Sequence, residues 1–450
     1  MPNLPATPHA TWPAKIFATL FGAFIGLALL KFSLPPVFAA SPMTAEFLAP
    51  PTSGWEWLLA QWPPTIGYSL LGGLALLGVA VAGWRTNVPR WLIALPMAWL
   101  AWQSLAAVQT VNAQISRATL EHFTAGVGCF YLGLFGLNRN QAPGFFLWPI
   151  AAAFAVMLAA GFNQHFGGLE ETRHYFYTYV YPTLKVVPPE YLKRMASDRI
   201  SSTSFYPNSL AGTILLVLPP VLAWIGQARE QFTVGARALL GGLVGGGALG
   251  CLYWSGSKGG WLLALVAGLI ALLHLKFSRH AKLILIGLVL AAGLAGFAWK
   301  YAGFFQRGAT SVVARMDYWH AAWDTAVARP VCGTGPGTFT VSYAKVKKPE
   351  SEMARLTHND YLQQASDSGF PGLLLYAAFV IGLLRVGYAG LGDGATGLRF
   401  GFWLGLLAWA LQALVEFPLY IPSVAWPAFA FAGWLLGSAG KRFDKARTAD

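Results

Sequence analysis

The stretch Leu283-Ile-Leu-Ile-Gly-Leu-Val-Leu-Ala-Ala-Gly-Leu-Ala-Gly-Phe-Ala-Trp299 contains no charged residue and no strongly polar one. A helix crosses the roughly 30 Å hydrocarbon core of a bilayer with about 20 predominantly apolar residues. Within that core the backbone N–H and C=O groups find no water, and a helix satisfies them internally. The stretch therefore predicts a membrane-spanning helix.

Eleven further apolar runs, each bounded by charged residues, prolines or glycine clusters, accompany this one along the chain. They cover residues 16–34, 66–84, 91–108, 120–137, 145–162, 209–225, 238–254, 260–275, 372–386, 400–414 and 420–436. Prolines and glycines inside several of the runs are tolerated in a membrane bundle, where small residues also allow close helix contact. The pattern predicts an all-α polytopic membrane protein with about 12 transmembrane helices and two long outward loops carrying short amphipathic helices.

The composition argues against a soluble or disordered protein. Of the 450 residues, 56% are hydrophobic and only 11% are charged, whereas soluble domains carry roughly 25% charged residues. A formal net charge of +13 is compatible with a polyanionic partner, but the basic residues occupy the gaps between apolar runs and form no basic face. We therefore expect a lipid bilayer, and no nucleic acid, as the partner of this surface.

Lysine and arginine are distributed unequally between the two sets of short connections. Fifteen lie in one set, which includes both termini, against three in the opposite set, namely Lys31, Arg117 and Lys258. Because positive short loops stay on the cytoplasmic side, we expect an inner (cytoplasmic) membrane protein with both termini in the cytoplasm. The long polar segments near residues 163–205 and 300–370 then face outward, to the periplasm of a Gram-negative cell.

The second long segment ends in Arg355-Leu-Thr357-His358-Asn359-Asp360, directly before an apolar run. Thr357 and Asp360 have capping-box spacing, which predicts a helix with His358 in its first turn. The positive end of a helix disfavours imidazolium, so His358 is expected to stay neutral and able to accept a proton, provided that no carboxylate cancels the effect. The alternative is a histidine that only forms hydrogen bonds within a loop.

Three cations stand at the borders of the outward segments. Arg315 and Trp319 share one face of an expected amphipathic helix on the membrane surface, although aromatic residues at such spacing more often serve packing or anchoring. Arg199 precedes the run at 209–225, and Lys258 is the only charge in a very short turn, where a lysine extending to the lipid interface is the alternative. Cations near His358 suit a lipid-linked phosphate or pyrophosphate. Ligand spacings typical of metal sites are absent from the sequence, so no metal or cofactor is expected.

At these residues the chain resembles the O-antigen ligase and polymerase superfamily of bacterial envelope glycosyltransferases, from about Arg199 to Leu436. The most specific element is His358-Asn359-x-x-Leu362 followed by Gly369-x-x-Gly372. The supporting elements are Arg315-x-x-x-Trp319, Pro330-x-x-Gly-x-Gly-x-Gly-x-Phe339, Thr203-x-Phe205-x-x-Asn208, Ser257-Lys258-Gly259-Gly260 and Val415-Glu416-Phe-Pro-Leu-Tyr-Ile-Pro422. Two positions depart from the family pattern, since Lys258 stands where many relatives have arginine and Asp367 where glutamate is frequent.

The resemblance implies an enzyme that takes a glycan from an undecaprenyl-pyrophosphate carrier on the periplasmic face, without a metal. A ligase transfers the glycan to a lipid A core or another glycan acceptor, and a polymerase transfers it to another lipid-linked repeat. In family terms His358 resembles the histidine that deprotonates or positions the acceptor hydroxyl, while Arg315 and Arg199 resemble the arginines that engage the pyrophosphate. Lys258, Asn208, Asn359 and Trp319 are the expected substrate-binding residues.

The resemblance also divides the chain into two regions. Residues 1–198 hold the first five expected helices and the first outward loop, and residues 199–450 form the ligase-like region with its large loop at about 300–370. Two readings from other classes remain open: a small-anion transporter, which twelve helices with internal glycine and proline also suit, and a non-catalytic scaffold. Ionisable residues are scarce in the middle of the runs, where transporter coupling sites usually lie.

Overall fold

The computed structural model describes residues 11–39, 53–137, 143–183, 192, 195–275, 277–306, 310–349, 351–391 and 397–438. Within these ranges every regular element is helical. Each of the twelve apolar runs coincides with one long helix. These are α1 (Trp12–Lys31), α4 (Pro64–Val81), α5 (Arg90–Val108), α6 (Ala113–Tyr131), α7 (Gly144–Asn163), α10 (Pro207–Gln227), α11 (Val234–Ser255), α12 (Lys258–His274), α13 (Arg279–Gln306), α16 (Asp360–Ala389), α17 (Gly397–Gln412) and α18 (Pro422–Gly437).

In the described part of the chain, eight helices are long and apolar enough to cross a membrane. They are α1, α4, α5, α10, α11, α13, α16 and α7 together with the helical segments that continue it to Tyr179. The remaining candidates are shorter, with 17 residues in α12 and 16 in each of α17 and α18, or more polar in the case of α6. The chain is thus an all-helical membrane protein, and the count of twelve spans stays a prediction.

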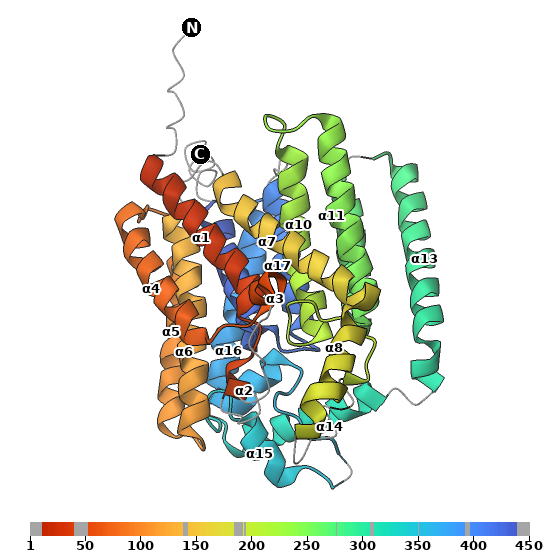
Figure 1. Ribbon diagram of the computed structural model, residues 1–450. Helices are drawn as coiled ribbons and strands as arrows, with labels where there is room; N and C mark the ends of the chain where they lie inside the picture. Colours follow the sequence, from red (N-terminus) through yellow and green to blue (C-terminus); the bar gives the residue numbers. More distant parts are fainter. Residues whose placement is uncertain are drawn as a thin grey trace.

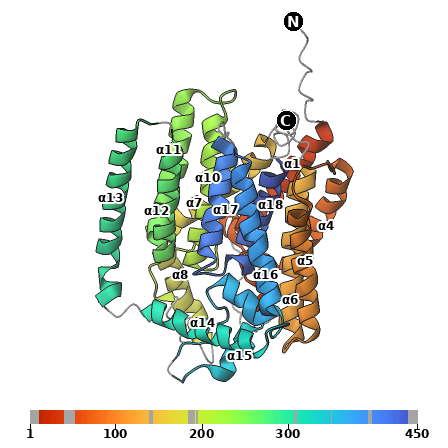
Figure 2. The same cartoon turned by 180° about the vertical axis from the view of Figure 1, so that it is seen from behind.

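Helix α18 lies at the centre of the bundle, and all 16 of its residues are buried. It packs against α1, α6 and α17. Close packing of this kind requires small side chains: a Cβ on Gly433 would lie 2.0 Å from the carbonyl oxygen of Phe130 in α6. At the opposite extreme, α13 stands at the side of the molecule in Figures 1 and 2, and none of its most apolar window is buried. Its exposed leucines and isoleucines suit contact with lipid.

Helices from the two predicted regions pack against one another. Helix α5 lies along α16, and α6 and α1 both contact α18. The structure therefore joins the N-terminal helices to the ligase-like region by extensive contacts, while the boundary at residue 198 stays a prediction.

Both long polar segments lie at the same end of the bundle. The first contains η3 (Gln164–Gly168), α8 (Leu169–Tyr175), η4 (Phe176–Val180) and η5 (Tyr181–Thr183), and the second contains α14 (Thr310–Ala328) and α15 (Phe339–Val346). Figure 1 shows α8, α14 and α15 at the end away from the start of α1. Figure 2 shows α14 lying across this end of the bundle, as expected for a helix on the membrane surface.

Candidate functional site

A buried carboxylate, Glu416, gathers three of the predicted site residues. It lies in the turn between α17 and α18 and is 8% exposed. One carboxylate oxygen, Oε2, is 2.9 Å from Nδ1 of His358. The other, Oε1, is paired with the guanidinium of Arg315 and accepts a hydrogen bond of 2.6 Å from Nδ2 of Asn208. Three segments far apart in the sequence therefore meet at one side chain.

Arg199 extends this network by one step. Its Nη2 donates to Oδ1 of Asn208 over 2.7 Å, and its Nε donates to the carbonyl of Ser255 over 2.7 Å. The guanidinium lies against Gly256, where φ is +61° and a Cβ would come within 3.1 Å of Nε. Asn208 itself is held at the first turn of α10, where Pro207 occupies a position that suits a helix start. Arg199, Arg315 and His358 are thus connected through Asn208 and Glu416.

The electrostatic environment keeps Glu416 ionised. Burial raises the pKa of Glu416, but the positive charge and hydrogen bonds supplied by His358 and Arg315 outweigh this effect and leave the pKa below its ordinary value. An ionised carboxylate only accepts hydrogen bonds. The proton of the His358–Glu416 bond therefore resides on Nδ1, and Nε2 is the ring nitrogen left to accept a proton in neutral imidazole.

Two aromatic rings hold the imidazole of His358. Its centroid lies 4.8 Å from the ring of Phe417 in edge-to-face contact and 6.0 Å from the stacked ring of Tyr318 on α14. The side chain remains 29% exposed. The ring is thereby oriented by packing and by Glu416 while one face of the site stays open to solvent.

The structure corrects the expected position of His358 relative to the helix. Asn359 is the N-cap, because its Oδ1 accepts from the amide of Leu362 over 3.0 Å, and α16 begins at Asp360. His358 precedes the cap in the left-handed region, with φ of +53°. The prediction that His358 lies in the first helical turn, capped by Thr357, is wrong: the asparagine amide oxygen is the better-placed acceptor for the third amide of the helix.

The expectation of a neutral His358 carried the condition that no carboxylate lies beside it, and the structure does not meet this condition. A carboxylate, Glu416, contacts the imidazole directly. The arrangement resembles that of catalytic histidines whose Nδ1–H donates to a buried carboxylate. In such sites the carboxylate fixes the orientation of the ring and stabilises the imidazolium that forms on proton transfer.

Helix α14 presents two donors that have no acceptor within the described parts of the chain. They are Nε of Arg315 and Nε1 of Trp319, both buried. The two residues are four positions apart and share one face of α14. Trp319 packs against the small apolar cluster that includes Tyr318 and Phe339. Buried donors without partners are costly.

Two further predicted residues, Lys258 and Asn359, lie near this network. The Nζ of Lys258 lies 4.1 Å from the ring centroid of Phe304 and 5.3 Å from that of Tyr301. Lys258 opens α12, two residues after the Gly256 against which Arg199 rests. Asn359 is 9% exposed and uses its side chain to cap α16. The structure therefore brings together His358, Arg315, Arg199 and Asn208, and gives Asn359 a structural contact.

Glu416 is the residue that reasoning from the sequence assigned no role. In the sequence it stands only as part of the segment Val415–Pro422 that resembles the family. A signal was present, because Glu416 is a single carboxylate in a short connection between two apolar runs, where an ionisable residue is expensive unless it is paired. Its partners could not be read from the sequence, since they are 58, 101 and 208 positions away.

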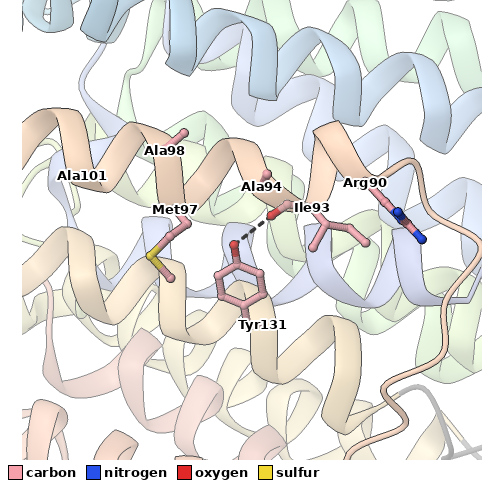
Figure 3. Close-up of a pocket in the computed structure, with 7 residues that line it drawn as sticks. All are labelled: Arg90, Ile93, Ala94, Met97, Ala98, Ala101 and Tyr131. Carbon is pink, nitrogen blue, oxygen red and sulfur yellow. Dashed lines mark hydrogen bonds between the residues drawn. The ribbon is translucent and has the colours of Figure 1, made fainter.

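A separate hollow of about 470 Å³ lies between α5 and α6. Figure 3 shows its apolar lining, with Ala94, Ala98 and Met97 on α5 and the hydroxyl of Tyr131 donating to the carbonyl of Ile93 over 2.8 Å. Arg90 is the only charged residue in the lining. Because no acid or base is paired there, this hollow does not offer the chemistry of the Glu416 network.

Comparison with known proteins identifies the region around the network. No curated protein matches the chain. Residues 243–377 match the model of the O-Antigen ligase family, a stretch that includes Lys258, Arg315, Trp319, His358 and Asn359. Arg199, Asn208 and Glu416 lie outside the matched stretch and reach the site through the fold. The match over residues 243–377 confirms the resemblance of this part of the chain to the O-antigen ligase and polymerase superfamily.

Proposed function

We propose that this protein transfers a glycan from an undecaprenyl-pyrophosphate carrier to an acceptor hydroxyl, in the manner of an O-antigen ligase. The observation that carries the proposal is the network centred on Glu416. It joins a histidine that can accept a proton to two arginines that can bind phosphate, and two of these three residues lie in the stretch that matches the O-Antigen ligase family.

The arginines supply the leaving-group side of the reaction. In the proposed step the bond between the anomeric carbon and the pyrophosphate oxygen breaks, and the electron pair departs with the pyrophosphate. Arg315 and Arg199 would stabilise that growing charge, and Nε of Arg315, which is buried, has no partner of its own among the described residues. Loss of one preorganised donor of this kind typically costs about 3 kcal/mol of transition-state stabilisation.

His358 supplies the acceptor side. As the acceptor oxygen forms its bond to the anomeric carbon, its proton passes to Nε2 of His358. Glu416 holds the Nδ1–H and stabilises the resulting imidazolium. Lys258 and Trp319 flank this centre and are proposed to bind substrate, whereas the cap formed by Asn359 positions the loop that carries His358.

The excess of basic residues in one set of connections supports an inner-membrane protein with cytoplasmic termini and a periplasmic site. The family description favours a ligase, with a lipid A core or another glycan as acceptor. A polymerase that extends another lipid-linked repeat is the alternative. The glycan profile of a strain lacking the protein distinguishes the two: a ligase defect leaves lipid-linked polymer, and a polymerase defect leaves single capped repeats.

Substitution of His358 by alanine tests the proposal. We expect His358→Ala to abolish glycan transfer from lipid-linked donor in membranes, because the carboxylate of Glu416, the other base among these network residues, is already paired with Arg315 and Asn208. His320→Ala is the matched control, since His320 is an exposed histidine on α14 and its variant should keep full activity. Both variants must reach the membrane at wild-type levels. Undiminished transfer by His358→Ala would refute the assignment.

A further inference from the structure

A row of exposed tyrosines follows α7 at the end of the molecule that carries the site. Tyr175, Tyr177, Tyr179 and Tyr181 are 43% to 63% exposed. They form two pairs on the helical segment, Tyr175 with Tyr179 at 5.4 Å and Tyr177 with Tyr181 at 5.8 Å between ring centroids. The neighbouring Phe176 is buried and contacts the second pair. We call these four residues the tyrosine segment.

The length of the helical stretch places the tyrosine segment beyond the hydrocarbon. The stretch Gly144–Tyr179 has 36 residues, of which about 20 suffice to cross the roughly 30 Å core at about 1.5 Å per residue. After α7 the chain turns at Gly167, where φ is +136°. Four polar residues, Glu170, Glu171, Arg173 and His174, then precede the tyrosines. Rings placed beyond this charged helix are poorly positioned to anchor in the bilayer.

Arg173 connects α8 by hydrogen bonds to residues 195–198, which directly precede Arg199 of the site. Its guanidinium donates to the carbonyls of Met195 and Ser197 at 2.9 and 3.0 Å, and to Oδ1 of Asp198 at 2.5 Å. The next residue is Arg199, which binds Asn208 of the Glu416 network. The tyrosine segment is therefore held one short backbone stretch away from an arginine proposed to bind pyrophosphate, and Figure 1 shows α8 at the same end of the bundle as α14.

We propose that the tyrosine segment binds the sugar chain that extends from the site. A pyranose ring has an apolar face of C–H groups and a rim of hydroxyls, and a tyrosine offers a rigid ring face together with a hydroxyl at low conformational-entropy cost. The pair Tyr175 and Tyr179, with ring centroids 5.4 Å apart, provides two neighbouring rings for the sugar chain. This inference rests on the proposed function for the source of the glycan, but the binding surface itself is testable without any transfer.

Binding of a lipid-free polysaccharide to the full-length protein in lipid nanodiscs tests the proposal. The probe is the fluorescently labelled polysaccharide released by mild acid from the envelope of the strain that carries the protein. We expect the double variant Tyr175→Leu/Tyr179→Leu to bind it at least 10-fold more weakly than wild type, because leucine keeps apolar bulk but has no ring face. Tyr175→Phe/Tyr179→Phe should stay within about threefold of wild type, since the ring faces remain. Tyr388→Leu, at an exposed tyrosine near the end of α16, should bind normally.

The outcomes separate this inference from the proposed function and from membrane anchoring. His358→Ala should bind the polysaccharide normally while failing in transfer. If the wild-type protein binds the polysaccharide through the tyrosines but shows no transfer, the inference about glycan binding stands and the proposed enzymatic activity is rejected. Wild-type binding by the leucine variant, with a defect only in Tyr175→Ala/Tyr179→Ala, would assign the segment to membrane anchoring and overturn the inference. Absence of polysaccharide binding by the wild type would overturn it as well.

Discussion

A single carboxylate organises the candidate site. Glu416 uses both oxygens, and each of its partners comes from a different part of the chain. A buried acid is stable only when its partners satisfy it, so Glu416 and the cations depend on one another. Removing the acid would leave the Arg315 guanidinium without its carboxylate and would free the imidazole of His358 to rotate.

We expect Glu416→Gln to reduce transfer by about 100-fold or more, because the amide keeps the shape of the side chain but no longer stabilises imidazolium. Glu121→Gln is the matched control. Glu121 is paired with Arg117 on an exposed helix face, where an ion pair contributes little. Transfer rates of purified protein with lipid-linked donor measure the effect. A Glu416→Gln enzyme with wild-type rates would show that the carboxylate plays no part in the reaction.

The same residue predicts a pH dependence of stability. The folded protein lowers the pKa of Glu416 below the ordinary value of 4.5. The corresponding stabilisation is fully present above pH 4.5 and is lost as the pH falls through the lower, folded pKa. Melting temperatures in detergent should therefore decline in that acidic range, and Glu416→Gln should lack this part of the decline.

At the scale of elements, a glycine turn packs against the kink of α16. The chain at 330–337 runs against α16: the amide of Gly335 donates to the carbonyl of Asp367 over 2.8 Å, and that of Gly337 donates to the Asp367 carboxylate over 2.8 Å. Gly369 kinks α16 with φ of +72°, and the amide of Phe370 donates to the carbonyl of Pro330 over 2.8 Å. This docking holds the kinked part of α16, the helix that begins two residues after His358.

Gly369→Ala is expected to lower the melting temperature by several degrees and to reduce transfer. A Cβ there would lie 2.2 Å from the carbonyl oxygen of Val331, and a positive φ costs a non-glycine residue about 1–3 kcal/mol. Gly72→Ala in α4 is the control, because nothing lies within 4 Å of its Cβ position. That variant should be neutral or slightly stabilised. Equal melting temperatures for the two variants would argue against a structural role for the kink.

At the scale of the whole molecule, both polar segments lie at one end of the bundle (Figure 1). The unequal distribution of lysine and arginine predicts that this end faces outward. Two exposed histidines offer a matched pair of reporters, His320 on α14 and His280 at the start of α13.

In a Cys332→Ser background, whose other cysteines are buried, His320→Cys should react with a membrane-impermeant thiol reagent in cells with a permeabilised outer membrane. His280→Cys should react only after the inner membrane is opened as well. The reverse pattern would place the Glu416 network on the cytoplasmic side and contradict the proposed function.

The sequence by itself determined the helical membrane fold. Apolar runs such as 283–299 predict helices because lipid offers no other partner for the backbone, and every run coincides with a helix. Family motifs singled out His358, Arg315, Arg199 and Asn208, and the structure brings these four together. In these cases the information is local, in hydropathy or in a short motif.

Only the tertiary structure decided how these residues are arranged. The capping pattern at Thr357 and Asp360 predicted a helical His358, but whether Thr357 or Asn359 caps a helix depends on a competition between neighbouring side chains that spacing does not resolve. The role of Glu416 and the attachment of the tyrosine segment through Arg173 arise from contacts between distant segments. Such contacts follow from the packing of the whole bundle, because the hydrogen-bonding partners of these polar groups are distant in the sequence and close only in the folded chain.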